Sequence, residues 1–171
     1  MAMIASGAGK PAVKPITPDT YERGLAIGAV ILLLFVVVAI ARGYGEWSRV
    51  PLTAWAHLAT MAVALVLTPI MLLRPRGTRV HRQLGRIWTA AMILTAAISL
   101  FIANPNLNRF SFIHILSIVV LVQVPLLVHA ARTHNIRRHR IQVRAMVTGA
   151  LLIAGFFTFP FDRLLGHWLF G

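Results

Sequence analysis

Five long apolar stretches constrain this chain more than any other feature of its sequence. A bilayer core about 30 Å thick is crossed by roughly 20 helical residues, each of which adds about 1.5 Å. Stretches of this length and polarity lie at 24–42, 52–73, 85–104, 110–131 and 144–163. The sequence therefore predicts an all-α membrane protein with five transmembrane helices.

The composition supports this class and argues against several others. Of the 171 residues, 58% are hydrophobic and only 12% are charged, whereas a soluble domain has about a quarter charged. A net charge of +13 would suggest nucleic acid in a soluble protein. Here the basic residues lie in short loops between apolar stretches, so we expect no nucleic-acid partner. The chain contains no cysteine, which excludes disulfides, thiolate metal ligands and a cysteine nucleophile.

The distribution of basic residues predicts the orientation in the membrane. If the chain crosses five times, 13 of its 17 Lys and Arg residues fall on the side that carries the N-terminus. Loops rich in Lys and Arg stay in the cytoplasm. We therefore expect a cytoplasmic N-terminus and an external C-terminus, with Trp47, Trp55 and Trp168 at the outer interface.

The first residues are expected to be a tail that precedes one membrane domain. Residues 1–17 are small, polar and contain proline, which predicts a disordered cytoplasmic tail. Residues 18–171 then form a single five-helix transmembrane domain. Thr17 and Pro18 resemble a helix start, with a threonine cap and a proline at the first helical position.

A basic phrase occurs twice, each time just before an apolar stretch. HRQLGR stands at 81–86 and HRIQVR at 139–144. Each is preceded by a histidine and then a proline: His57 and Pro69 in one case, His114 and Pro125 in the other. This predicts a hairpin repeat, 52–104 and 110–163, that forms a pseudo-two-fold four-helix bundle of spans two to five, with span one peripheral. Chance similarity between two basic loops is the alternative.

Ionisable residues inside a membrane are candidates for function. His57 and His114 lie at equal depth, and the predicted symmetry would place them across the axis from each other. Two facing histidines are the axial ligands that haem b requires. The alternatives are ordinary hydrogen bonds across a helix contact, or a quinone or metal site with Asp162 and His167 as outer partners.

The basic loops suggest a surface for phosphate-bearing lipids. Arginine clusters at the cytoplasmic face bind anionic head groups, and an acidic surface on a protein partner is the competing use. The candidate residues are Arg79, His81, Arg82, Arg86, Arg137, Arg138, His139, Arg140 and Arg144.

The favoured function is a non-catalytic membrane subunit or scaffold that binds lipid head groups or a larger membrane complex. The alternative is a haem or quinone electron-transfer protein with His57 and His114 as ligands. The four acidic residues do not form a catalytic pair in the sequence, so we expect no catalytic residues. No cofactor is firmly expected; haem b is the candidate.

The motif HR-x-x-GR at 81–86, the later His139-Arg140 pair and the ending AGFFTFPFDRLLG at 154–166 carry a resemblance. Over about His57 to Gly166, the chain resembles a family of small bacterial predicted membrane proteins, catalogued as a domain of unknown function. That family's HR-x-x-M is altered here, because Met146 comes later. The resemblance implies a multi-pass protein of the bacterial cytoplasmic membrane and no established activity. The layout is also similar to the four-helix core of b-type membrane cytochromes, in architecture only.

Overall fold

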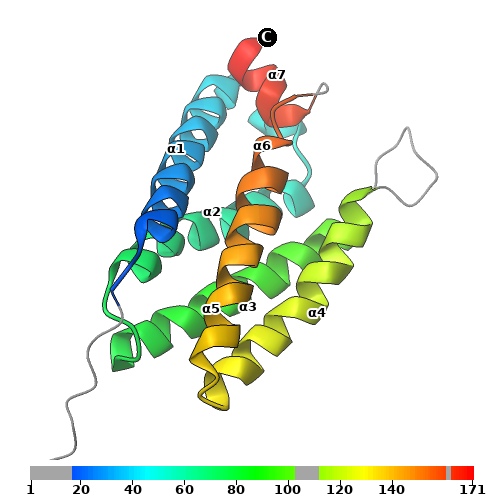
Figure 1. The fold of residues 1–171 in the computed structure, drawn as a ribbon. Helices are drawn as coiled ribbons and strands as arrows, with labels where there is room; N and C mark the ends of the chain where they lie inside the picture. The colour runs from blue at the N-terminus through cyan, green and yellow to red at the C-terminus, as the bar shows by residue number, and fades with distance from the viewer. Residues whose placement is uncertain (1–16, 103–111, 161–162) are drawn as a thin grey trace, which may run out of the picture.

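A computed structural model describes residues 17–102, 112–160 and 163–171, and this part of the chain is helical with no strand. The long helices are α1 (Thr20–Arg42), α2 (Leu52–Leu73), α3 (Arg79–Phe101) and α4 (Phe112–Arg132). A further helical rod combines α5 (Ile136–Met146), the π-helix η2 (Val147–Ile153) and α6 (Ala154–Phe156). The 3₁₀ segment η1 (Gly43–Arg49) follows α1, and α7 (Leu164–Phe170) ends the chain (Figure 1).

The long helices run alternately up and down. The start of α1, the α2–α3 loop at 74–78 and the α4–α5 turn at 133–135 therefore lie toward one end of the molecule, which we call the basic end (Figure 1). The C-terminal α7 lies at the opposite end, beside the end of α1. This is the alternation that the sequence predicted.

Four helical segments are long and apolar enough to cross a membrane: Thr20–Arg49, Leu52–Leu73, Arg79–Phe101 and His114–Arg132. This confirms four of the five predicted spans in length and composition. The fifth differs, because the rod begins with the polar segment Ile136–Arg144 and its helix ends at Phe156, short of Pro160. Within the described residues it is not among the helices that meet the criterion, so the fifth span stays a prediction.

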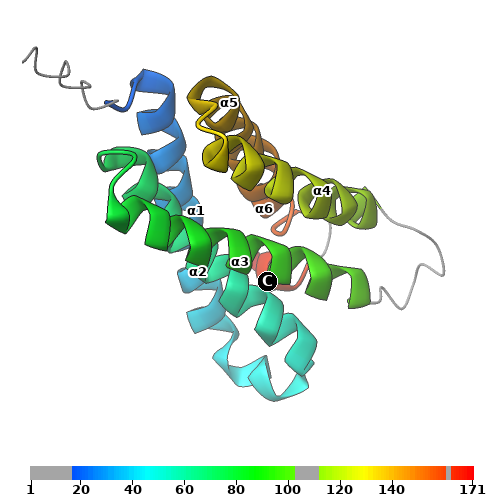
Figure 2. The same cartoon turned by 90° about the horizontal axis from the view of Figure 1, so that it is seen from below.

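The helix α1 is part of the bundle, and the prediction that it is peripheral is wrong. It contacts α2 on one side and η2 and α7 on the other, as Figure 2 shows from below. Its alanines Ala26, Ala29 and Ala39 are at most 2% exposed. Small residues allow helices to approach closely where lipid supplies no hydrophobic driving force. The opposite face of α1 keeps exposed aliphatic side chains, as a lipid-facing surface does.

Two glycines form the contact between α1 and the C-terminal rod. A Cβ placed on Gly28 would lie 3.2 Å from Leu152, and one on Gly155 would lie 2.5 Å from Leu32. Each helix therefore fits a leucine over a glycine of the other. Gly24, the other member of the Gly24-x-x-x-Gly28 pattern, has nothing within 4 Å.

The predicted four-helix bundle of spans two to five therefore includes α1 as a further helix. Contacts run from α2 to α3, from α3 to α4 and from α4 to α5, and α1 then connects η2 back to α2. The helix α1 thus completes the arrangement. The two hairpins also differ, because α3 is an uninterrupted 23-residue α-helix while its counterpart passes into the π-helix η2.

Three tryptophans gather at the end opposite the basic end. The Trp47 and Trp55 rings are 5.3 Å apart, and the Trp55 and Trp168 rings are 6.3 Å apart. Trp168 Nε1 donates to Glu46 Oε2 at 2.9 Å. The three side chains that the sequence assigned to one interface therefore lie together, as in an aromatic belt.

Candidate functional site: a carboxylate–arginine cluster at the basic end

The helix start assigned from sequence is wrong by two residues, and the difference creates the site. The N-cap is Asp19, whose carboxylate accepts from the Glu22 backbone N–H at 3.0 Å. The Glu22 side chain accepts from the Asp19 backbone N–H at 3.2 Å. This is a capping box, in which two otherwise unpaired donors at the helix start are satisfied. It fixes both carboxylates on the first turn of α1.

Glu22 is almost completely buried, with 1% of its side chain exposed, and three arginines surround its carboxylate. Arg140 donates from Nε to Oε1 at 2.7 Å and from Nη2 to Oε2 at 3.0 Å. Arg144 donates from Nη2 to Oε1 at 3.0 Å, and Arg76 donates from Nη2 to Oε2. A buried carboxylate is stable only when it is paired and hydrogen-bonded in this way.

Asp19 forms the exposed side of the same cluster. It pairs with Arg144 and lies 3.1 Å from Arg140 Nη2. The backbone N–H of Glu22, and after it the Arg144 guanidinium, hold the pKa of Asp19 below its usual range. The hydrogen bond to Glu22 raises the pKa of Arg140. All these groups therefore remain charged at neutral pH.

Tyr21 extends the cluster along the C-terminal rod. Its hydroxyl lies 2.7 Å from Thr148 Oγ1 in the π-helix, and the Arg144 guanidinium lies 5.5 Å from the centre of its ring. Arg140, Arg144 and Thr148 are spaced four residues apart, which places them on one side of a helix. The cluster thus joins α1 to α5 and η2 and, through Arg76, to the α2–α3 loop.

We call Asp19, Glu22, Arg76, Arg140 and Arg144 the carboxylate–arginine cluster. It combines two carboxylates with three guanidiniums and so keeps one positive charge. Arg76 Nη1 is buried and has no hydrogen-bond partner among the described residues. The arrangement can hold helices together and attract an anion. It does not contain the base and nucleophile pair of a hydrolase.

The two copies of the repeated basic phrase are used differently. In the second copy, His139 Nδ1 lies 3.1 Å from the Leu127 carbonyl oxygen and Arg140 belongs to the cluster. In the first copy, His81 Nδ1 is buried and has no partner within the described structure. Arg82 donates from Nη1 to the Gly77 carbonyl of its own loop. Each copy thus keeps one buried polar atom without a partner among the described residues: His81 Nδ1 in the first copy and Gln142 Oε1 in the second.

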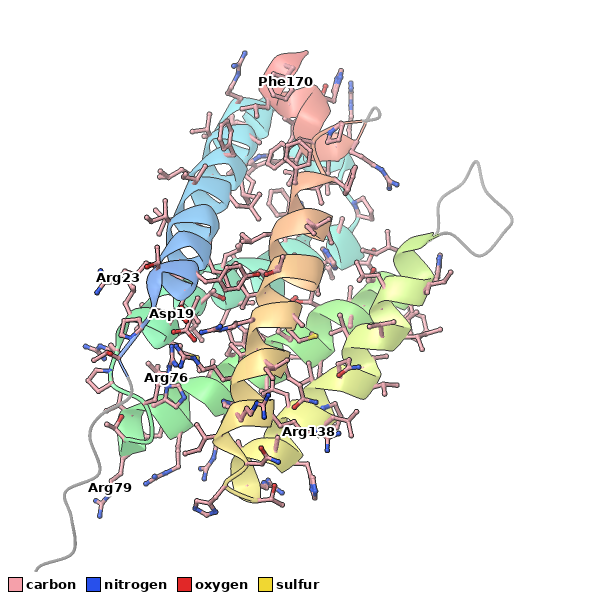
Figure 3. All side chains as sticks on the ribbon, viewed as in Figure 1. Asp19, Arg23, Arg76, Arg79, Arg138 and Phe170 are labelled. Carbon is pink, nitrogen blue, oxygen red and sulfur yellow. The ribbon has the colours of Figure 1, made fainter. Side chains whose placement is uncertain are left out.

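The other predicted lipid-binding arginines are exposed. Arg79 extends away from the helices in Figure 3, and Arg138 is exposed as well. No ion pair to a carboxylate is recorded, in the described part of the chain, for any of the following exposed residues: Arg79, Arg82, Arg86, Arg137 and Arg138. The nine residues that the sequence suggested for lipid binding therefore fall into three groups by pairing and exposure. Arg140 and Arg144 are partly exposed and paired with Glu22, His81 and His139 are half-buried, and the other five arginines are exposed.

The predicted haem ligands occupy different helices separated by α3, which contacts both α2 and α4. The half-buried His57 lies next to the Thr95 backbone on α3, and its Nδ1 has no partner among the described residues. Within those residues there is no group of three His, Cys, Asp or Glu side chains that could hold a metal. His167 lies 3.9 Å from Glu46, and Asp162 is outside the described residues. Haem or quinone binding at His57 and His114 stays a prediction.

Sequence reasoning missed Asp19, Glu22 and Arg76 as members of a site. A signal was present: two of only four acidic residues stand three apart at the start of the first helix, on the side that carries the arginine loops. In a chain this basic, a carboxylate at that position has several guanidinium partners within reach.

Comparison with protein-family models, with curated proteins and with solved structures finds no match to this chain. The resemblance to a family of small bacterial membrane proteins therefore stays a prediction, and the site is interpreted from its own geometry.

Proposed function

We propose that this protein is a multi-pass membrane protein that binds anionic lipid head groups through the exposed arginines of its basic end and acts as a non-catalytic subunit or scaffold. The observation that supports the proposal is that some arginines of the basic end are paired with carboxylates, whereas the others are exposed. The two acidic residues at that end, Asp19 and Glu22, are paired with arginines of the cluster: Arg76, Arg140 and Arg144. The exposed arginines therefore have no carboxylate partner among the described residues. Lipid phosphate is the abundant anion at this depth of the membrane.

Arginine suits this role because its planar guanidinium donates two parallel hydrogen bonds to a phosphate. A fixed cluster next to the exposed arginines also holds α1, the α2–α3 loop and α5 together. The binding surface is then presented by a rigid end of the bundle. An acidic surface on another membrane protein would meet the same arginines and is the alternative occupant.

The experiment compares lipid retention by purified protein. A variant with glutamine at five of the exposed arginines of this end should retain fewer molecules of phosphatidylglycerol in native mass spectrometry and the same number of phosphatidylcholine; the five are Arg79, Arg82, Arg86, Arg137 and Arg138. The matched control is Arg42→Gln with Arg49→Gln, two exposed arginines at the opposite end. Unchanged phosphatidylglycerol retention in the five-arginine variant would contradict the proposal. Retention of a stoichiometric membrane protein, lost in the same variant, would favour the partner instead.

The orientation and the fifth span belong to the same proposal. The rod from Ile136 to Phe156 has 21 residues, which is roughly 31 Å of helix, although its first turns are basic. Because the chain has no cysteine, single cysteines report sidedness cleanly. Thr133→Cys should react only with reagent on the cytoplasmic side, and Ser48→Cys and Gly171→Cys only from outside. Labelling of residues 133 and 171 from the same side would exclude the fifth span.

A further inference from the structure

The surface between α2 and α3 at the basic end carries an open groove with one apolar part and one polar part. The apolar part has a volume of about 440 Å³ and is lined by Pro69, Ile70, Leu73 and Leu84, with Arg74 at its rim. The second part, of about 300 Å³, shares Ile70, Arg74 and Leu84 with the first and adds Met71, Pro75, Thr78, Val80 and His81; we call it the polar part for Thr78 and His81, although apolar side chains also line it. Because the two parts share residues, they form one continuous groove.

We propose that this groove is a specific site for one anionic phospholipid, with an acyl chain along the apolar part and the phosphate beside Arg74 and His81. The inference deepens the proposed function by naming one site on the basic end. The groove lies where α2 leaves the apolar region and the basic loop begins, so its polarity changes along its length as that of a phospholipid does. Its two volumes fall in the range of small-molecule pockets.

The polar part offers donors and no acid. Arg74 is exposed, and the charges of His139 and Arg76 both act on His81. His81 Nδ1 is buried without a partner within the described structure, as is Arg76 Nη1. A buried polar atom without a partner costs free energy, and such atoms in native proteins usually have an unseen partner. Arg74 and His81 both line this part of the groove, so a phosphate oxygen there meets the Arg74 guanidinium and becomes the partner of His81 Nδ1 when the half-buried ring turns toward it.

Comparison with the second copy of the basic phrase explains why we place the lipid site at the first hairpin and not at the second. His139, the counterpart of His81, already contacts the Leu127 carbonyl oxygen, and Arg140 is committed to Glu22. In the phrase at 139–144, the imidazole nitrogen that corresponds to His81 Nδ1 therefore already has a carbonyl neighbour, and the first arginine is paired with a carboxylate. The same six-residue pattern closes the bundle at one hairpin and leaves the other able to bind a ligand.

The test titrates detergent-purified protein with dipalmitoyl phosphatidylglycerol and measures binding of the first lipid by native mass spectrometry. His81→Ala should weaken the first binding event about tenfold, since it removes a hydrogen bond to a charged group. His81→Asn should retain most of the affinity, because its side-chain amide places an N–H close to the position of Nδ1. His129→Ala is the matched control, because His129 is exposed and does not line the groove, and it should leave first-lipid affinity unchanged.

A second variant tests the apolar part without disturbing the fold. Leu73 is half exposed, so Leu73→Trp fills the groove from its surface. It should also weaken the first lipid about tenfold while the thermal midpoint stays near that of the unaltered protein. Soluble glycerol phosphate should fail to compete, because it lacks the chain, and phosphatidylcholine should bind the first site at least tenfold more weakly.

The outcomes separate this inference from the proposed function. If His81→Ala and Leu73→Trp leave the first lipid unchanged, the groove site is wrong, whereas loss of later lipids in the five-arginine variant still supports the general proposal. If the five-arginine variant keeps all its lipids but the groove variants lose the first, the general proposal fails and the groove stands. Equal first-site affinity for phosphatidylglycerol and phosphatidylcholine in the unaltered protein overturns the groove assignment by itself.

Discussion

Arg140 donates two hydrogen bonds to Glu22, 118 residues earlier in the chain, at 2.7 and 3.0 Å. The contact joins the first turn of α1 to the middle of α5. It also removes from the lipid-facing set an arginine that the sequence had assigned to head groups. The carboxylate–arginine cluster therefore determines both how the basic end is held together and which arginines remain available to a ligand.

Replacing Glu22 should destabilise the protein more than any other single acidic substitution. Glu22→Gln leaves three guanidiniums facing one another without their shared carboxylate. Breaking a buried ion pair costs about 3–5 kcal/mol, and partial exposure of the arginines reduces this to about 2–3 kcal/mol. The thermal midpoint in detergent measures the loss. Glu46→Gln, at the opposite and more exposed end, should change it little; equal effects of the two variants would argue against the cluster.

Acidification should weaken the basic end through Asp19. Its pKa is lowered in the folded protein relative to an ordinary value of 3.8, so its contribution is present above that pH and is lost as the pH falls through the folded value. The expected effect is small, because Asp19 is exposed. Asp19→Asn keeps the cap and removes the charge. Its thermal midpoint should lie below that of the unaltered protein at pH 6 and approach it progressively as the pH falls below 3.8; a constant difference would contradict the assignment.

The junction of α1 and α7 should be intolerant of a side chain at Gly43. A Cβ there would lie 2.1 Å from the Trp168 ring, and a rigid indole cannot move aside without displacing α7. Gly43→Ala should cost about 2–3 kcal/mol by overpacking and alter tryptophan fluorescence. Gly45→Ala, two residues on and with nothing within 4 Å of the new Cβ, should be nearly neutral. Similar behaviour of the two variants would show that α7 does not pack as described.

The packing of α1 on the C-terminal rod predicts a similar contrast. Gly155→Val places a branched side chain against Leu32, one of whose methyl groups lies 2.5 Å from where the new Cβ would be. The expected loss is about 2 kcal/mol. Gly149→Val lies in the same rod with no atom within 4 Å of its Cβ and should have little effect. The measurement is the SDS concentration at which half of each variant is unfolded. If α1 were peripheral, this concentration would be the same for the two variants.

The proposed function also predicts the absorption spectrum. Protein purified from haem-replete cells should show no Soret band, oxidised or reduced. A Soret band that is lost in both His57→Ala and His114→Ala, and kept in His134→Ala, would instead assign axial ligands and replace the lipid-binding proposal with electron transfer.

The sequence alone predicted the elements whose cause is local. An apolar stretch of about 20 residues has one stable form in lipid, so α1 to α4 could be located from composition and length. Alternation of direction then placed the basic loops at one end. The helix start was assigned to Thr17 because several residues there can cap, and the choice of Asp19 depends on a reciprocal bond with Glu22.

Only the tertiary structure decided which helices are neighbours, and therefore which arginines are paired with carboxylates and which are exposed. Nothing local distinguishes Arg140 from Arg82 or His139 from His81, because the two phrases have the same pattern. What separates them is the position of α1 between α2 and η2, which brings Glu22 to one phrase and leaves the other open. Side-chain pairing across helices depends on relative position in space, and the free energy that selects it comes from contacts between segments far apart in the chain.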